Sequence, residues 1–506
     1  MAWERFTMLQ YLPDIPDALK PADSWSVLTD ANWRDGAAYR DLGEGTAYAT
    51  GTAVNRMEWV WSYATTGTSN RRVLYAGRNS AGIGTKLGIY TSAGTHTDVT
   101  TADWIAVGAA STTTNLFTGG FLGGGILVNI YSPLHAPVWF SQSTATATDL
   151  SATLRFAALR PYKYFAIGIA DKNTPSPGTV RWSDAIAPGV APTTWAPAAG
   201  NAAGDFDVSG ALGGELVDGG QLGEDFVIYG QQSMHLMSYV GGATVMTERR
   251  LSANTGLMGR NCWADTGNGH VALTADDVVL VTPGSITSVC DVKARKLILS
   301  AIYASTVPDA SQVWYERKRN RVWVAYCIGS TYLTNAFILD LTTGQWGKKT
   351  LSRASSGAAN IEGAASTEPN LYLSFSSSTL ASNNLYAVDS DGGSGSGVTT
   401  AWYKYDLDMG DSARRKFLRG VRILGGDASS ATGTAATVKV RVGSKNSPEA
   451  AYTFDTQTSY ALGTAQQRGC LIDGRWLAVE IESSATTDKA YHITGFELDW
   501  DWAAGW

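Results

Sequence analysis

Apolar and polar residues alternate along this chain in short runs, and turn residues separate the runs. In AFILDLTTGQW, at residues 336–346, Phe337, Leu339 and Leu341 alternate with other residues before a Thr-Thr-Gly segment and a closing tryptophan. Alternation over about four to eight residues predicts a β-strand, and the Thr-Thr-Gly segment predicts a tight turn. Such a unit is typical of one repeated sheet in a larger β assembly. It also fits the rim of a carbohydrate-cleaving pocket.

Pairs of such strands recur through the middle of the chain at intervals of roughly 50 residues. Each pair joins two strands of about five residues through a short polar turn, as in a β-hairpin. The pairs lie at residues 71–91, 126–143, 225–240, 269–284, 321–346 and 371–392. This spacing is typical of propeller blades, and radial closure protects strand edges. We therefore predict an all-β fold with a β-propeller of about six blades at residues 41–397; an array of β-sandwiches is the rival arrangement.

The N-terminal region differs from this repeated part. Residues 12–25, LPDIPDALKPADSW, are rich in proline, which disrupts helix interiors and central strands. This predicts an extended N-terminal docking arm at residues 1–40 that becomes ordered only against another surface, such as a neighbouring subunit or an adaptor. Its aromatic side chains need burial, which makes them interface candidates. These candidates are Trp3, Phe6, Tyr11, Trp25 and Trp33.

The C-terminal region differs from the other two in its pattern of apolar and polar residues. The segment DSDGGSGSGVTT, at residues 389–400, predicts a flexible hinge. Beyond it, runs such as TVKVRVGS (437–444) and FELDWDW (496–502) place apolar residues on one face and polar residues on the other. These strands predict a separate C-terminal β-sandwich at residues 398–506.

Composition and charge narrow the functional classes. Glycine accounts for 55 of the 506 residues, and charged residues make up 17%, against an average of roughly 25%. The formal net charge of −6 argues against a general nucleic-acid binder, which needs excess cations to displace phosphate counterions. The four cysteines form no C-x-x-C pair, so a zinc ribbon is not expected. Cys290 and Cys327 lie in apolar runs and are expected to be buried free thiols.

Neither a membrane span nor a secretory signal is expected. Residues 104–148 carry no charged side chain, but Thr, Asn and repeated Gly interrupt every window of about 20 residues, so buried strands are favoured. The opening MAWERFTMLQ has no basic start followed by an apolar core. We expect the chain to be made and assembled in the host cytoplasm.

Candidate catalytic groups are scattered. The acids considered for glycoside cleavage, which needs two nearby carboxylates, are Asp184, Asp205, Asp276, Asp277 and Asp340. Asp276 and Asp277 fit a turn, and Asp340 resembles the structural aspartate of a sialidase "Asp box". Ser233 and His235 share a strand face without a nucleophile-elbow motif.

Other motifs also favour a role without catalysis. The histidines, His96, His135, His235, His270 and His492, are too far apart in sequence for a local metal cluster. GQWGKKT, at residues 344–350, lacks phosphate-loop spacing and is interpreted as a solvated turn. We therefore predict no catalytic residues, no metal and no cofactor.

Two basic clusters remain. YERKRNR, at residues 315–321, and DSARRKFLRGVR, at residues 411–422, could each meet DNA phosphate or an acidic protein face. The first is interpreted as a solvated turn. In the second, Arg414, Arg415 and Lys416 are interface candidates for a contact between domains or subunits.

Several segments resemble a tail-protein family of short-tailed bacteriophages. The opening LPDIPDALKPADSWSVLTDANWRDGAAYR resembles that family's proline-rich arm, with Trp25, Asn32 and Gly36 carrying the likeness. Further segments that resemble family elements, in the same order, are VRWSDAIAPGVAPTTW (180–195), YVGGATVMTERRL (239–251), GHVALTADDVVLV (269–281), GRWLAVEIES (474–483) and ITGFELDW (493–500).

The resemblance implies a virion protein similar to the tail nozzle of these phages. Such a protein is a β-propeller with extra β domains, commonly a homo-hexamer, and forms the distal DNA channel below the tail adaptor protein. Its expected partners are the adaptor, tail fibre, spike or needle proteins, and genomic DNA in transit, with no stable membrane insertion. The alternative is a carbohydrate-binding or depolymerising propeller at a phage tail tip. Exposed aromatics on one face would support the alternative, and tryptophans buried between blades would support the scaffold.

Overall fold

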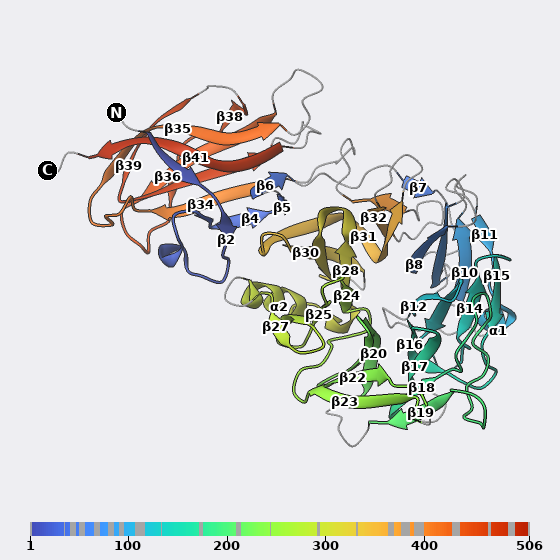
Figure 1. The fold of residues 1–506 in the computed structure, drawn as a ribbon. Coiled ribbons are helices and arrows are strands. Elements are labelled where there is room, and N and C mark those ends of the chain that lie inside the picture. Colours follow the sequence, from blue (N-terminus) through green and yellow to red (C-terminus); the bar gives the residue numbers. More distant parts are fainter. Residues whose placement is uncertain are drawn as a thin grey trace.

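The computed structural model of the protein is dominated by β-strands (Figure 1). It describes residues 3–34, 36–40, 47–49, 56–64, 71–78, 85–90, 96–106, 117–132, 134–171, 176–208, 214–242, 244–290, 294–329, 332–362, 369–375, 385–388, 399–427, 436–463, 467–483 and 491–503. Helical elements in these ranges are α1 (Ala102–Ala106), α2 (Arg295–Tyr303) and the 3-10 turns η1 (Asp17–Leu19), η3 (Pro308–Ala310) and η4 (Arg317–Arg319). The prediction of an all-β fold is confirmed.

Within the described residues, five four-stranded antiparallel meanders follow one another and are named sheets I to V. Sheet I is β8 (Arg56–Ala64), β9 (Arg71–Arg78), β10 (Thr85–Tyr90) and β11 (His96–Asp98). Sheet II is β12 (Phe117–Leu122), β13 (Gly125–Ile130), β14 (Val138–Ser141) and β15 (Thr146–Asp149). Sheet III is β16 (Phe156–Tyr162), β17 (Phe165–Asp171), β18 (Ser176–Trp182) and β19 (Gly204–Asp207). Sheet IV is β20 (Leu216–Leu222), β21 (Asp225–Gly230), β22 (Met234–Tyr239) and β23 (Met246–Ser252), and sheet V is β24 (Trp263–Asp265), β25 (His270–Leu273), β26 (Val278–Val281) and β27 (Ile286–Ser288).

Two further meanders share one long strand. Sheet VI is β28 (Gln312–Glu316), β29 (Arg321–Tyr326), β30 (Leu333–Asp340) and the first part of β31 (Gln345–Glu362). The second part of β31 begins sheet VII, where it pairs with β32 (Pro369–Phe375), followed by β33 (Leu385–Ala387) and β7 (Ala47–Ala49). The last strand of sheet VII therefore comes from a segment that precedes sheet I in the chain.

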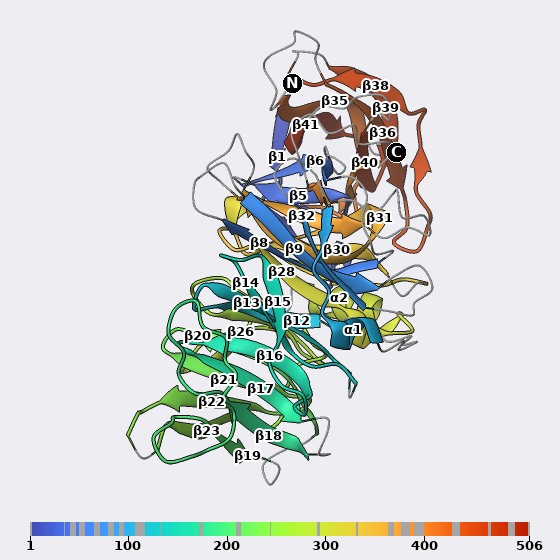
Figure 2. The same ribbon diagram turned by 90° about the vertical axis from the view of Figure 1, so that its right-hand side faces the viewer.

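The first strands of these sheets contact one another in succession. Strand β8 contacts β12, β12 contacts β16, and β16 contacts β20, while β24 contacts β28 and β28 contacts β31. The second part of β31 returns the series to β8. Between β20 and β24, a Cβ on Gly220 would lie 2.1 Å from the Trp263 ring, so only glycine permits this approach. Figure 1 shows these sheets following one another around one region of the molecule, and Figure 2 shows the same sheets from the side.

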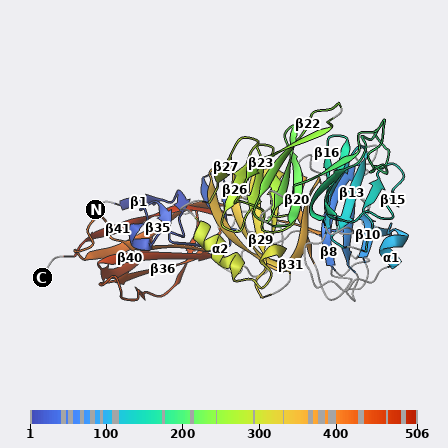
Figure 3. The ribbon, with the colours of Figure 1, turned by 90° about the horizontal axis from the view of Figure 1, so that it is seen from below.

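Strands from both ends of the chain form a second unit, named the C-terminal unit. One of its sheets has the order β37 (Thr453–Phe454), β36 (Thr437–Lys445), β40 (Trp476–Ser483), β34 (Ala401–Leu407) and β4 (Val27–Thr29), with β38 (Thr458–Ala461) also on β36. The other joins β39 (Arg468–Gly474), β35 (Lys416–Asp427), β41 (Tyr491–Trp502), β1 (Trp3–Thr7), β6 (Ala37–Arg40) and β5 (Ala31–Arg34). Figure 3 shows this unit beside sheets I to VII. Strand β5 connects the two parts, because Ala31 pairs with Lys348 of β31.

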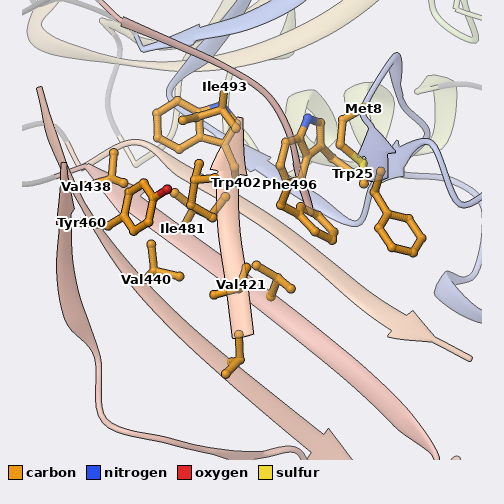
Figure 4. Packing of buried hydrophobic residues seen from close by; sticks show 14 of the residues in the cluster. Met8, Trp25, Trp402, Val421, Val438, Val440, Tyr460, Ile481, Ile493 and Phe496 are labelled. Atoms are coloured by element: carbon orange, nitrogen blue, oxygen red, sulfur yellow. The ribbon is translucent and has the colours of Figure 1, made fainter. Parts of the chain in front are cut away.

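One hydrophobic core joins the two sheets of the C-terminal unit (Figure 4). Val440 and Ile481 come from one sheet, and Val421 and Phe496 come from the other. All four are buried, as the one-sided apolar pattern of these strands predicts. The predicted hinge at residues 389–400 lies outside the described residues except for its last two positions.

The N-terminal arm is part of this core, which corrects our expectation that it needs a neighbouring subunit or an adaptor for order. Strand β1 pairs antiparallel with β41, and the Phe6 ring stacks on Phe496 at 5.3 Å between centroids. Trp25 is fully buried beside the same Phe496 ring, while Trp33 donates its indole N–H to the carbonyl of Trp346 at 3.0 Å. The surface that orders the described part of the arm therefore belongs to the same chain.

The proline-rich part of the arm caps helix α2, which lies between sheets V and VI in the chain. Short strands β2 (Gln10–Tyr11) and β3 (Ser24–Trp25) pair in parallel on either side of this proline-rich part. The Asp14 carboxylate accepts the backbone N–H groups of Lys296 at 2.6 Å and Leu297 at 2.9 Å, at the start of α2. A carboxylate at a helix N-terminus satisfies orphan donors and complements the helix dipole.

Other local predictions have mixed outcomes. The solvated-turn interpretation of residues 344–350 is wrong beyond Gly344, because residues 345–350 lie in β31. There Trp346 is buried by packing against sheet V, and Lys349 is buried over the Trp323 ring.

The Asp276–Asp277 turn is confirmed between β25 and β26, and all four cysteines are buried and free. No helix in the described part of the chain is long and apolar enough to cross a membrane.

A buried lysine at the arm makes stability depend on pH. Lys404 is almost fully buried and donates to the carbonyl of Pro21 at 3.0 Å. Burial lowers the pKa of Lys404 to about 8, although Asp17, Asp23 and Asp406 raise it. Between about pH 8 and pH 10 the unfolded chain therefore binds more protons than the folded chain, so this residue's contribution to stability rises with pH.

We expect the unfolding free energy of the wild type minus that of Lys404→Met to increase from about pH 7.5 to about pH 9.5. Denaturant unfolding at both pH values measures this difference, and the variant removes the contribution of other titrating groups. A difference that stays constant or falls with pH would contradict the assignment.

Candidate functional site

A cavity of about 530 Å³ lies where the first strands of sheets I to VII meet. Its lining comes from β8, β12, β16, β20, β24, β28 and the second part of β31, with flanking residues. Five of its side chains are aromatic: Trp59, Trp61, Phe121, Trp263 and Trp314. The Trp59 and Trp61 rings are stacked at 6.0 Å with 15° between their planes. The cavity is within the size range of small-molecule sites, roughly 300–1,000 Å³.

Polar side chains gather where the first strands end. They are Lys163, Gln221, Asp265, Arg317 and Asn360. Neighbouring members contact one another: the Gln221 amide oxygen accepts the Lys163 N–H at 3.4 Å, and the Asn360 amide oxygen accepts the Arg317 N–H at 3.3 Å. We call this group of residues the mouth of the cavity. Lys163 pairs with Glu224 at 2.9 Å, and Asn360 donates to the carbonyl of Tyr315 at 2.7 Å. The mouth therefore combines amide groups with a small number of charges of both signs.

A buried ion pair holds the wall of the cavity together. The Arg160 guanidinium donates Nε to Asp218 Oδ1 at 2.8 Å and Nη2 to Oδ2 at 2.6 Å. Arg160 also donates to the carbonyl of Gly119 at 3.0 Å and to Asn261 Oδ1 at 2.6 Å. Trp263 adds an indole N–H to Asp218 at 3.0 Å. This network connects sheets II, III, IV and V.

The environment keeps Asp218 ionised. Its side chain is fully buried, and burial alone would raise the pKa of the carboxyl. The Arg160 charge and the backbone N–H groups of Asn261 and Gly219 outweigh that effect and hold the pKa of Asp218 below its usual value. The pair is a fixed structural link, with its charges already satisfied within the chain.

A neutral histidine supports the same wall. His270 Nε2 lies 2.7 Å from the carbonyl of Gln221, so this nitrogen donates, and Nδ1 accepts from the Tyr229 hydroxyl at 2.9 Å. Burial lowers the pKa of His270 to about 4, so the imidazole stays uncharged near neutral pH. Its ring stacks on Trp263 at 4.2 Å and fixes the orientation of the indole.

The carboxylates considered for catalysis occupy separate turns or surfaces. Asp340 accepts the Thr342 N–H at 2.9 Å and the Thr343 hydroxyl at 3.1 Å, as expected for a turn aspartate. Asp277 accepts the Val278 N–H at 2.8 Å. Asp184 accepts backbone N–H groups, Asp205 and Asp276 are exposed, and none of the five lines the cavity between the first strands.

Ser233 and His235 do share a strand face, and a third residue completes a hydrogen-bonded series. The Ser233 hydroxyl lies 3.3 Å from His235 Nε2, and His235 Nδ1 lies 2.5 Å from Glu248. Both Ser233 and His235 are fully buried, so a substrate carbonyl has no approach to the hydroxyl. In the described ranges, no group of three or more His, Cys, Asp or Glu residues is arranged to hold a metal ion.

Most of the arm's interface candidates are buried against other parts of their own chain. Phe6, Tyr11, Trp25 and Trp33 are buried. Trp3 is half-buried, with the Arg422 guanidinium 4.6 Å from its ring. The first four therefore have no surface to offer a neighbouring subunit in this conformation.

The basic candidates separate into one buried and two exposed residues. Lys416 is buried and donates to the carbonyls of Arg475, at 2.7 Å, and Asp411, so it is not an interface residue here. Arg415 is exposed and pairs with Asp473, with Nε 3.1 Å from Oδ1. Arg414 is exposed, and its guanidinium lies 4.2 Å from the centre of the Trp502 ring. The two arginines remain candidates for a contact outside the chain.

The other basic cluster lies largely at a turn. Arg317 and Lys318 are exposed in η4, whereas Arg319 and Arg321 pair with the buried Glu316 at 3.0 Å and 2.8 Å. The predicted solvated turn is therefore correct for Arg317 and Lys318. Arg319 and Arg321 instead stabilise the hairpin of sheet VI.

Sequence reasoning did not identify the cavity or its Arg160–Asp218 link. The available signal was a charged residue inside each of two apolar strands, in FAALRPY (156–162) and LVDGGQL (216–222). Buried charges in proteins are generally paired, so these two residues were candidates for a mutual contact. No protein-family model matches the chain, and no curated protein matches it.

Proposed function

We propose that this chain is a structural virion protein, the tail nozzle of a short-tailed bacteriophage, with no enzymatic role. The observation that carries the proposal is the use of its tryptophans: every tryptophan among the described residues is buried or half-buried. Trp346 donates to the carbonyl of Val289 at 3.1 Å and so links β31 to the end of sheet V. A tryptophan that joins two sheets, as Trp346 does, suits a scaffold, whereas a carbohydrate-cleaving propeller is expected to present aromatic side chains on an exposed face.

The proposed architecture is a β-propeller, with sheets I to VII as seven blades in place of about six. Two features support it: the first strands contact one another in a series that returns to β8, and β7 completes sheet VII from the N-terminal side. A late blade completed by an early strand closes the ring, which removes an exposed edge. The shared strand β31 makes the sixth and seventh blades difficult to separate by spacing alone.

DNA passage requires several copies of the chain. The cavity between the first strands has about 530 Å³, which suits a small molecule. A compact space of this volume is roughly 8 Å across, which is less than the width of the DNA major groove alone, about 12 Å. Duplex DNA therefore cannot enter it. The proposed channel is therefore enclosed by a ring of copies, as the hexamer implied by the resemblance would be. Tail adaptor and fibre, spike or needle proteins are the proposed partners of that ring.

The charge of the chain supports transit of DNA through such a ring. A net charge of −6 favours a channel wall that repels phosphate, so the duplex does not adhere. Arg415 is paired with Asp473 and Lys416 is buried, which leaves few strong phosphate contacts in that cluster. Arg414 and Arg415 are proposed to face protein neighbours.

Purified protein tests the ring directly. Native mass spectrometry followed by negative-stain electron microscopy should show a closed homo-oligomer with a central channel wider than a DNA duplex. A chain that stays monomeric at high concentration, both alone and mixed with a tail adaptor, would contradict the nozzle proposal.

A further inference from the structure

We infer that the cavity between the first strands is a binding site for a saccharide unit. This goes beyond the proposed scaffold role, which makes no use of the cavity. The inference rests on the size of the cavity, the aromatic faces in its wall and the polar groups at its mouth. Ligand sites combine a mainly apolar wall with a few placed polar groups that fix orientation.

The aromatic wall offers flat apolar surfaces. Trp61 and Trp263 are half-buried and Phe121 is half-exposed, so a ligand in the cavity can reach these rings. The Trp263 indole is held by two contacts: its N–H donates to Asp218, and its ring stacks on His270. A rigid aromatic platform of this kind suits the apolar face of a pyranose ring, because little conformational entropy is lost on binding.

The polar groups of the mouth suit hydroxyl groups. Gln221 and Asn360 present side-chain amides. Each amide already donates one N–H to a backbone carbonyl, of Gly223 and of Tyr315, and accepts one backbone N–H at its oxygen. Since an amide has two N–H donors and two oxygen lone pairs, one donor and one acceptor site on each side chain remain for a sugar hydroxyl. The charges largely cancel: Lys163 pairs with Glu224, and Arg317 and Asp265 have opposite signs. A phosphate-rich ligand would require an excess of cations, and a lipid would require an apolar mouth. A neutral, polyhydroxylated ring fits both requirements.

The test uses the full-length chain and a panel of methyl glycosides of glucose, galactose, mannose, rhamnose and N-acetylglucosamine. Saturation-transfer NMR at about 20 mM ligand should detect at least one of them, and tryptophan fluorescence then measures its affinity. Trp61→Ala should weaken binding by about tenfold or more. Trp502→Ala, which changes a half-buried tryptophan of the C-terminal unit, should leave the affinity unchanged.

Phe121→Ala keeps the test decisive if Trp61→Ala does not fold, because the Phe121 side chain is half-exposed and its loss should spare the fold. It should also weaken binding several-fold. Absence of transfer from every glycoside, or binding that is unaffected in the folded variants, would overturn the inference.

Oligosaccharides of the bound sugar distinguish two sources of the ligand. Tighter binding of the oligosaccharide than of the methyl glycoside indicates the end of a surface glycan, and equal affinity for the two indicates a free sugar. Electron microscopy of the ring does not depend on this result, so the two proposals can fail separately.

Discussion

Asp218→Ala should lower the free energy of unfolding by about 3–5 kcal/mol. The substitution leaves the Arg160 guanidinium buried without its carboxylate, and an uncompensated buried charge is costly. It also removes the acceptor for N–H groups of Gly219, Asn261 and Trp263. Because these groups belong to sheets IV and V and to the segment between them, the loss should affect the packing of several sheets together.

Chemical denaturation of the purified variant measures this effect. Asp276→Ala is the matched control, since that carboxylate is exposed and accepts a local bond from the Thr274 hydroxyl at 3.1 Å. The control should change stability by no more than about 0.5 kcal/mol. Equal stabilities for the two variants would show that the Arg160–Asp218 pair does not hold the sheets together.

Trp25→Ala should destabilise the C-terminal unit by about 3–5 kcal/mol. The side chain is fully buried in the core that both sheets of this unit share, next to Phe496 and Met8. Removing the indole leaves a cavity that the surrounding strands can fill only in part. The arm should then lose its attachment to β41, so proteases should cut it faster in the variant.

Denaturation and limited proteolysis of isolated monomer provide the measurement. Leu19→Ala is the control from the same arm, because Leu19 is 74% exposed and should contribute within about 0.5 kcal/mol. If Trp25→Ala were as stable and as resistant as the control, the arm would not belong to the core of its own chain.

Local patterns located many of the strands but could not assign their partners. The alternation in AFILDLTTGQW identified β30 and the turn after it, where Gly344 has a φ of 67°. The same pattern could not show that β31 continues from sheet VI into sheet VII, since that depends on pairing with β32. Lys348 and Lys349 suggested a solvated turn, yet Lys349 is covered by the Trp323 ring. Burial of a lysine stem against an aromatic ring is a tertiary contact that local composition does not encode.

The arm and the cavity depend on contacts between distant parts of the chain. Prolines correctly excluded regular strands from residues 12–22, but the partner of the arm, β41, begins more than 450 residues later. Arg160 and Asp218 are separated by 58 residues. Each looks like an isolated charge in an apolar run, and only the succession of sheets brings them together. The sequence therefore predicted the type of element well and the site poorly.

Immunogold electron microscopy of the virus particles that carry this gene tests the central claim most directly. The nozzle proposal predicts gold label at the distal end of a short tail, with several copies of the chain per particle. Label on the capsid, or particles that contain none of this protein, would contradict it.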